Sequence, residues 1–263
     1  MDLGLKGKVA LVAASSQGLG RAVADELAAE GALLVMNGRN AETLEYAAAE
    51  IRETHKADIL AVAGDVSKTD DVERIVNEGL QRFGRIDILV TNSGGPSAGT
   101  FDNISRETWD QAYRILLTSV IDMTRLVLPG MRERGWGRIL NITSIAAKQP
   151  VENLMLSNSF RAGVTGFSKT LAAEVAEHGI TVNTILPGYT ATERVVELAE
   201  TLGRKEGIEP AAIRERWEAE IPMRRLGEPR EFAALATFLV SERASYITGS
   251  SIAVDGGWIK SLF

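Results

Sequence analysis

The 263-residue sequence contains no cysteine and only two histidines, His55 and His178. The lack of cysteine excludes disulfide bonds, thiol catalysis and zinc sites built on thiolates. Two histidines far apart in the sequence argue against a multi-histidine metal centre within one chain. We therefore expect no metal site.

Long hydrophobic runs and an excess of basic charge are also missing. No apolar stretch approaches the ~20 residues of a membrane-spanning helix, and the first residues lack the apolar segment of a secretory signal. The formal net charge is −6, whereas proteins that wrap duplex nucleic acid carry a basic excess. We expect a cytoplasmic protein with no nucleic-acid or membrane partner.

Strand-like and helix-like segments alternate along the chain. Short apolar runs typical of buried strands occupy residues 9–14, 32–36, 59–63, 86–90, 138–142, 181–186 and 251–254. Amphipathic helical patterns lie between them, as in 41–55, 106–134, 153–177 and 229–241. Strands that are apolar throughout indicate a parallel sheet covered on both faces. The sequence predicts an α/β fold: one doubly wound Rossmann domain, residues 1–263, with a seven-stranded parallel sheet and helices on both faces.

Residues 192–227 depart from this pattern, because they carry many charges of both signs and few strongly apolar positions. We expect one or two exposed helices inserted at the C-terminal edge of the sheet. The segment is either a substrate lid or a solvated excursion.

The first strand–helix turn, residues 13–20, reads Ala-Ala-Ser-Ser-Gln-Gly-Leu-Gly. Small residues let backbone amides approach a pyrophosphate, and the following helix N-terminus offers the positive end of its dipole. In open parallel sheets, ligands bind outside the carboxyl ends of the strands. The turn predicts dinucleotide binding, although a lone Gly-x-Gly also fits a simple tight turn.

Further motifs accompany this turn in a consistent order: Asp65-Val66, Thr-Asn-Ser-Gly at 91–94, Gly-Arg-Ile at 137–139, Pro-Gly-Tyr at 187–189, Ile-Thr-Gly at 247–249 and Val-Asp-Gly-Gly at 254–257. Together they resemble the short-chain dehydrogenase/reductase family, in particular its β-ketoacyl-acyl carrier protein reductase branch, over essentially the whole chain.

The resemblance implies a set of cofactor-binding residues. Those near the pyrophosphate would be Ala14, Ser15, Ser16, Gly18, Leu19 and Gly20, with Ala14 replacing the family's first glycine. Asp65 and Val66 would flank the adenine, and Asn92 and Gly94 would line the adenosine side. Pro187, Gly188 and Thr192 would contact the nicotinamide half. Asp65 could instead be a strand-end cap, and Pro187-Gly188 only a turn.

The end of the second strand bears on the choice of cofactor. It reads Asn-Gly-Arg-Asn, residues 37–40, with no acidic residue to hold the ribose 2′-hydroxyl of NAD. Arg39 suits a 2′-phosphate. We expect NADP, with NAD as the alternative.

The reactive end departs from the family pattern. The family uses a serine, a tyrosine, a lysine and an asparagine; Ser144 matches the serine, but Ser157 and Arg161 stand where tyrosine and lysine belong, and Leu116 replaces the asparagine. An alkyl hydroxyl is a far weaker acid than a phenol. Arg161 cannot relay protons as a tuned lysine can, but it can stabilise negative charge or bind a carboxylate or phosphate.

Three readings of the function remain from the sequence. One is an NADP(H)-dependent oxidoreductase resembling 3-oxoacyl reductases, in which Ser144, Ser157 and Arg161 act on a small carbonyl compound or acyl thioester, with Tyr189, Tyr113 or Lys148 as substitute proton donors. Another is a catalytically silent dinucleotide-binding sensor or scaffold. The third is a different reaction, in which Arg161 recruits an acid substrate. Arginines near the lid could receive an acidic carrier protein or form surface ion pairs: Arg214, Arg216, Arg224 and Arg225. The resemblance also implies a homotetramer.

Overall fold

The structure is a computed structural model, and it describes residues 1–262. Its centre is a seven-stranded parallel sheet in the order β3-β2-β1-β4-β5-β6-β7. The strands are β1 (Val9–Val12), β2 (Leu33–Gly38), β3 (Ile59–Ala63), β4 (Ile88–Thr91), β5 (Gly137–Ile142), β6 (Ile180–Pro187) and β7 (Ser251–Val254). The predicted α/β fold with seven parallel strands is confirmed.

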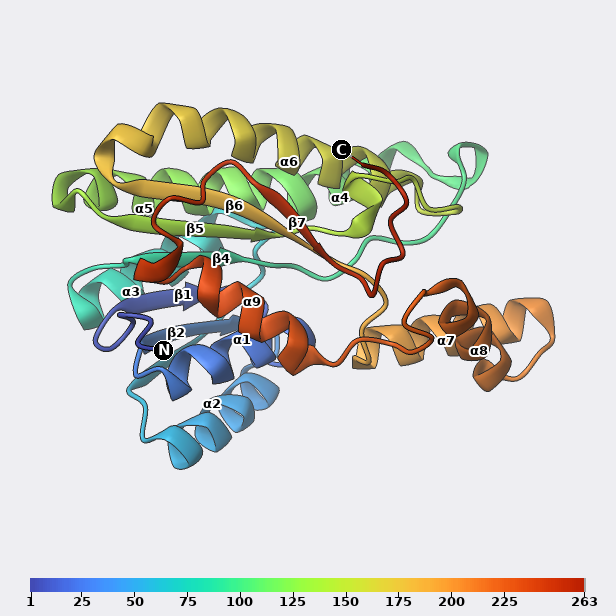
Figure 1. Cartoon of the computed structure of the whole chain (residues 1–263), viewed down its shortest axis with the longest axis horizontal. Helices are drawn as coiled ribbons and strands as arrows, with labels where there is room; N and C mark the ends of the chain where they lie inside the picture. Colours follow the sequence, from blue (N-terminus) through green and yellow to red (C-terminus); the bar gives the residue numbers. More distant parts are fainter. Residues whose placement is uncertain (263) are drawn as a thin grey trace.

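Helices cover both faces of this sheet, as Figure 1 shows. Helices α1 (Gly18–Ala29), α2 (Ala41–His55) and α9 (Pro229–Leu239) pack on one face. Helices α3 (Thr69–Phe83), α5 (Ser119–Arg134) and α6 (Met155–Val175) pack on the other. Short 3-10 turns lie at Phe101–Asn103, Ile145–Ala147, Ala176–His178 and Glu242–Ala244. The central strands are buried from both sides, which explains their uninterrupted apolar sequences.

The strand order reverses beside β1, whose neighbours are β2 and β4. At such a point the loops that leave adjacent strands diverge to opposite faces, and a crevice opens at the carboxyl ends of the strands. The turn after β1 and the segment after β4 therefore face one another across the predicted cofactor site.

The helical segment predicted at 106–134 is interrupted. Helix α4 (Arg106–Tyr113) runs into a π-helical turn, Arg114–Thr118, before α5 begins. A π turn inserts an extra residue into the helix and is often found at functional sites. Here it carries Leu116, which is buried.

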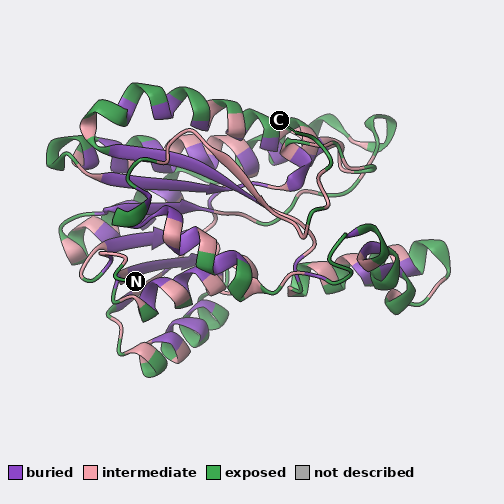
Figure 2. Cartoon of the chain, in the orientation of Figure 1, coloured by how far each residue is buried: buried purple, intermediate pink, exposed green. Residues whose placement is uncertain are grey.

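Residues 192–227 hold two helices, α7 (Glu193–Glu206) and α8 (Pro210–Glu220), which project beyond the sheet (Figure 1). Figure 2 shows that their outer surfaces are exposed around a small buried centre. That centre consists of Ala199, Ile213 and Trp217, with Tyr189 packed against them. The hairpin is joined to the body by two chain segments that meet at a β-bridge between Thr190 and Gly227.

Candidate functional site

The bend between β1 and α1 has the geometry of an anion site. Ala14 adopts a left-handed backbone (φ 46°), and Gly18, also left-handed (φ 58°), begins α1. The residue before it, Gln17, makes no side-chain capping bond, and the first turn of α1 holds no acidic residue. The backbone amides at this helix N-terminus are therefore left to a ligand, and the helix dipole favours a negative one.

Gly20 is required by close packing inside this bend. A Cβ atom added there would lie 2.3 Å from the carbonyl oxygen of Ala14 and 2.8 Å from Nδ2 of Asn92. The Asn92 amide donates a hydrogen bond to the same carbonyl oxygen, at 3.2 Å. The end of β4 thus holds the bend after β1 in place.

Ser15 is held by hydrogen bonds within the protein. It is fully buried, its hydroxyl donates to the carbonyl of Val12 at 2.9 Å, and its amide donates to the carbonyl of Asn37 at 2.7 Å. Both of its donors are occupied within the protein, so neither is free for a diphosphate. Ser15 fixes the bend to β1 and β2.

Asn37 is a positioning residue that the sequence patterns do not reveal. Its side-chain oxygen accepts from the amide of Ala14 at 3.3 Å, and its side-chain nitrogen donates to the carbonyls of Val62 and Gly64. Its own amide donates to the Ser15 hydroxyl at 3.1 Å. One buried amide side chain therefore joins the bend to the end of β3.

Replacing Ser15 by alanine is expected to lower the free energy of unfolding by about 1–3 kcal/mol, because the buried amide of Asn37 loses its acceptor. Ser159→Ala, which removes an exposed hydroxyl on α6, should change it by less than about 0.5 kcal/mol. Chemical denaturation measures both. Unchanged stability of Ser15→Ala with weakened dinucleotide binding would contradict the structural role.

The predicted adenosine-side residues surround the ends of β2, β3 and β4. Arg39 is exposed, Val66 is buried, and a Cβ added at Gly94 would meet nothing within 4 Å. Asp65 accepts hydrogen bonds from the amide and hydroxyl of Ser67, so its carboxylate caps the turn before α3. Ser16 packs against the backbone at Gly38.

The segment after β6 lies beside the bend. Pro187 ends β6, Gly188 packs against Asp255, and Thr192 precedes the first turn of α7. A Cβ added at Gly18 would lie 3.7 Å from both the Thr192 side chain and a Glu193 carboxylate oxygen. The N-termini of α1 and α7 therefore approach each other, and a groove of about 540 Å³ runs between these two helices.

Ser144 and Ser157 stand at the reactive end of the sheet. Ser144 follows β5 and its hydroxyl accepts from the amide of Ala146 at 3.1 Å. Ser157 lies in α6, one helical turn before Arg161, and both are buried with 7% of their surface exposed. Ser144 caps the turn Ile145–Ala147, and this turn packs against α6, which carries Ser157.

Arg161 is a buried cation without an acidic partner. Its Nη1 donates to the carbonyl of Ile142 at 2.7 Å, but its Nε is buried without a hydrogen-bond partner. No carboxylate in residues 1–262 forms an ion pair with it. Burial lowers the pKa of Arg161 to about 10, so the guanidinium still carries its charge at neutral pH.

Leu116 lies in an apolar cluster. It is fully buried in a cluster with Ala112 and Leu156, against which Trp109 and Phe160 also pack. An aliphatic side chain offers no hydrogen bond to a water molecule. The Leu116 side chain therefore cannot hold a proton-relaying water.

The three substitute proton donors differ in their surroundings. Tyr189 stacks on Trp217 with ring centroids 4.9 Å apart, and burial, assisted by the Glu220 carboxylate, raises the pKa of Tyr189. Tyr113 is 46% exposed and its ring lies against Phe160. Lys148 follows the 3-10 turn after Ser144 and is exposed.

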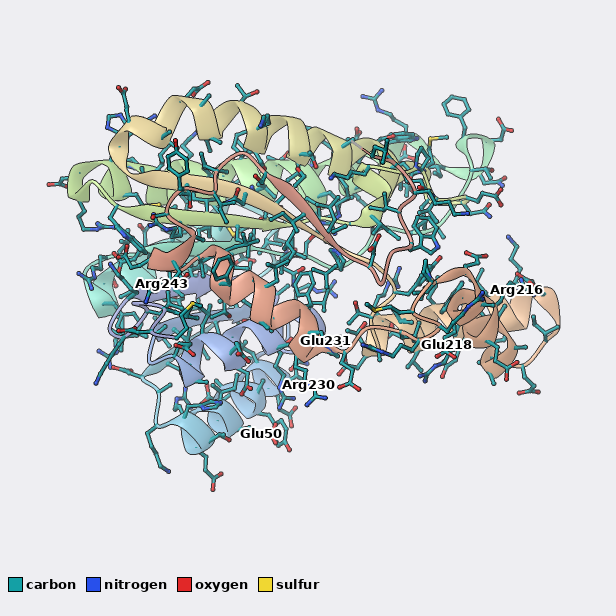
Figure 3. The ribbon with its side chains drawn as sticks, in the orientation of Figure 1. Glu50, Arg216, Glu218, Arg230, Glu231 and Arg243 are labelled. Carbon is teal, nitrogen blue, oxygen red and sulfur yellow. The ribbon has the colours of Figure 1, made fainter. Side chains whose placement is uncertain are left out.

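The lid arginines form ion pairs within the chain. Arg214 pairs with Glu218, Arg216 with Glu206, and Arg225 with Glu231. Figure 3 shows Arg216 and Glu218 on the projecting hairpin. Arg224 donates to the carbonyl of Ala219. Three of these four cations therefore have a carboxylate partner within the chain, and Arg224 has a backbone carbonyl.

The part of the chain that the structure describes shows neither a cluster of metal-binding side chains nor a membrane-spanning helix. No group of three or more metal-binding side chains comes together in residues 1–262. Within the same residues, none of the helices is long and apolar enough to cross a membrane.

Comparisons with known proteins agree with this geometry. The profile of the family described as Enoyl-(Acyl carrier protein) reductase matches residues 13–259. The NADPH-dependent reductase BacG of Bacillus subtilis (strain 168) is 35% identical over 256 residues, covering 97% of this chain and 99% of the relative. The 3-oxoacyl-[acyl-carrier-protein] reductase FabG of Aquifex aeolicus (strain VF5) is 32% identical over 257 residues, covering 98% and 99%.

Among solved structures, L-sorbose reductase from Gluconobacter frateurii, complexed with NADPH and L-sorbose, superposes with a TM-score of 0.95 at 37% identity, and all of both chains is covered. The matches span the whole domain and include the bend, the sheet and the reactive end. The chain belongs to the short-chain dehydrogenase/reductase family.

Proposed function

We propose that the protein is an NADP(H)-dependent reductase of a small carbonyl compound. The observation that carries this proposal is the bend at residues 14–20. The N-terminus of α1 has no side-chain cap there, and the backbone at Gly20 lies so close to the Ala14 carbonyl that only glycine fits. These residues fit a dinucleotide, because the free amides of α1 suit a diphosphate and Gly94 leaves room beside them. The relatives named above include reductases that use NADPH.

Arg39 supports NADPH over NADH. It follows β2, is exposed, and forms no ion pair with any carboxylate of residues 1–262. No acidic residue lies between Asn37 and Asn40 to bind a ribose hydroxyl. A free guanidinium at this point binds a 2′-phosphate by charge-assisted hydrogen bonds.

Replacing Arg39 by aspartate is expected to weaken NADPH binding about tenfold or more and to strengthen NADH binding, since one charge-assisted contact is lost and a ribose partner is gained. Arg39→Gln removes the cation without adding an acid, so it should lose NADPH affinity without gaining NADH affinity. Fluorescence titration of each nucleotide measures both. Equal NADPH affinity in all three proteins would refute this role of Arg39.

At the reactive end, the chain supplies hydroxyls and one fixed positive charge. When bound, the reduced nicotinamide supplies a hydride to a carbonyl carbon. Ser144 holds the carbonyl oxygen by a hydrogen bond, and Arg161 keeps the local potential positive. Ser157 completes a polar surface but is too weak an acid to protonate the product oxygen efficiently, so water supplies that proton.

A dinucleotide-binding protein without catalysis is the second candidate. The Leu116 cluster and the missing phenol favour it. Purified protein mixed with NADPH and a panel of 3-oxoacyl thioesters and 3-oxo acids separates the two, with the absorbance of reduced nicotinamide followed over time. Nucleotide binding without any turnover above buffer would support the second candidate and overturn the first.

We also propose that residues 1–263 act as one dinucleotide-binding domain in which 192–227 form a lid, and that the protein is a cytoplasmic homotetramer. The assembly would use the long helices α4–α5 and α6 and the strand β7, as the family resemblance implies. A gel-filtration mass close to that of a single chain would contradict the tetramer.

A further inference from the structure

Arg161 is the strongest unsatisfied group in the described part of the molecule. It lies in the interior with only 7% of its surface exposed, and neighbouring residues give it one hydrogen bond, to the carbonyl of Ile142. A buried charge is normally paired with an opposite charge or fully hydrogen-bonded. Arg161 has neither, so its surroundings favour an anionic ligand.

The remaining donors of Arg161 fit a particular anion. Nη1 is occupied by Ile142, and Nε and Nη2 make no hydrogen bond within residues 1–262. These two nitrogens form one edge of the planar guanidinium, and their N–H groups match the two oxygens of a carboxylate in a bidentate pair. Nε is covered by protein atoms in this structure, so the side chain has to shift slightly when the pair forms.

The Nε–Nη2 edge of Arg161 belongs to the same part of the fold as Ser144, the residue proposed to bind the substrate carbonyl. The carbonyl that holds Arg161 belongs to Ile142, two residues before Ser144, and Ser157 lies one turn earlier on the same helix. A small molecule whose carbonyl oxygen is bound by Ser144 can therefore place a second polar group near the guanidinium.

We propose that the substrate is an oxo acid, whose carboxylate pairs with Arg161 while its keto oxygen binds Ser144. This inference rests on the proposed reductase function and narrows its substrate class. A ground-state carboxylate, unlike the transient charge on a carbonyl being reduced, also neutralises Arg161 while the substrate waits in the site. A neutral ester or thioester of the same length provides no such charge.

The first test compares an acid with its neutral derivative. Steady-state reduction of 3-oxobutanoate and of its methyl ester is measured with NADPH, and the wild type should prefer the acid by about 10–100-fold in kcat/KM, the range of one charge-assisted pair. Equal values for acid and ester would overturn the inference and leave the reductase function intact.

Three variants assign the preference to Arg161. Arg161→Gln should remove most of the preference for the acid over the ester, while Arg161→Lys, which keeps the charge, should retain part of that preference. Lys169→Gln is the matched control, because it removes an exposed cation from the same helix, and it should leave the preference unchanged. Loss of the preference in Lys169→Gln would indicate a general effect of charge and overturn the inference.

A binding measurement keeps the inference separate from catalysis. If no carbonyl compound is reduced, calorimetry of 3-oxobutanoate with the wild type and with Arg161→Gln, each saturated with NADP⁺, decides the matter. Binding of the acid that is lost in Arg161→Gln would support the carboxylate site although the reductase function has failed. No binding to the wild type, or equal binding to both proteins, would overturn the site.

Discussion

Replacing Ser157 by tyrosine is expected to raise kcat by about 100-fold or more, the usual contribution of a positioned general acid. The phenol would lie one helical turn from the buried Arg161, and a neighbouring positive charge lowers the pKa of a phenol from its usual ~10 towards neutrality. The added hydroxyl would thus supply the proton that Ser157 cannot.

The control for this variant is Ser157→Phe, which has nearly the same size but no hydroxyl. Both proteins are assayed at saturating NADPH with the best carbonyl substrate, and their thermal unfolding is compared to detect overpacking. A gain in Ser157→Tyr that Ser157→Phe does not share assigns the effect to the proton. Equal rates in both variants and the wild type would show that proton supply does not limit turnover.

Replacing Gly20 by alanine is expected to weaken dinucleotide binding by about 100-fold or more. The new methyl group would fall 2.3 Å from the Ala14 carbonyl oxygen, so the bend and the start of α1 must separate. Amides displaced from a diphosphate lose charge-assisted hydrogen bonds worth about 1.5–3 kcal/mol each. Overpacking should also lower the free energy of unfolding by about 1–3 kcal/mol.

Gly166→Ala provides the matched control, because this residue lies within α6 and an added Cβ would meet nothing within 4 Å. Alanine in a helix interior is favoured over glycine by about 0.5–1 kcal/mol. The control should therefore be slightly more stable and bind NADPH as the wild type does. Calorimetric titration with NADPH checks both variants, and wild-type affinity in Gly20→Ala would contradict the assignment of the bend.

The sheet could be predicted from the sequence because its strands are buried on both faces. A parallel strand under two helical layers needs apolar side chains in both directions, and this produces short continuous runs such as Ile59–Ala63. The ends of the strands are harder to predict where polar residues continue a strand. β2 extends through Asn37 to Gly38, beyond the predicted end at residue 36.

The network around the bend could not be predicted in the same way. Asn37 and Ser15 are far apart in the sequence, and only the pairing of β1 with β2 brings them together. A lone asparagine at the end of an apolar run does not indicate that its side chain will accept a hydrogen bond from one segment and donate hydrogen bonds to another. The π turn at Leu116 likewise follows from packing against α6 and not from a local pattern.

At the reactive end, Ser157 and Arg161 could be singled out from the sequence, but the absence of an ion-pair partner for Arg161 could not. The spacing of Ser157 and Arg161 after Ser144 places both on one face of a helix near the end of β5. Whether Arg161 is paired depends on carboxylates from any part of the chain, because an ion-pair partner need not be close in sequence. Only the structure shows that residues 1–262 provide none.

The hairpin α7–α8 has a hydrophobic centre of its own, and this has a mechanical consequence. Because Trp217 and its neighbours pack among themselves, the two helices hold each other as one unit. Beyond the bridge at Thr190 and Gly227, Arg194 donates to the carbonyl of Pro96, and the amide of Met223 donates to the carbonyl of Gly256. A load placed on the hairpin is therefore shared between the segment after β4 and the segment after β7.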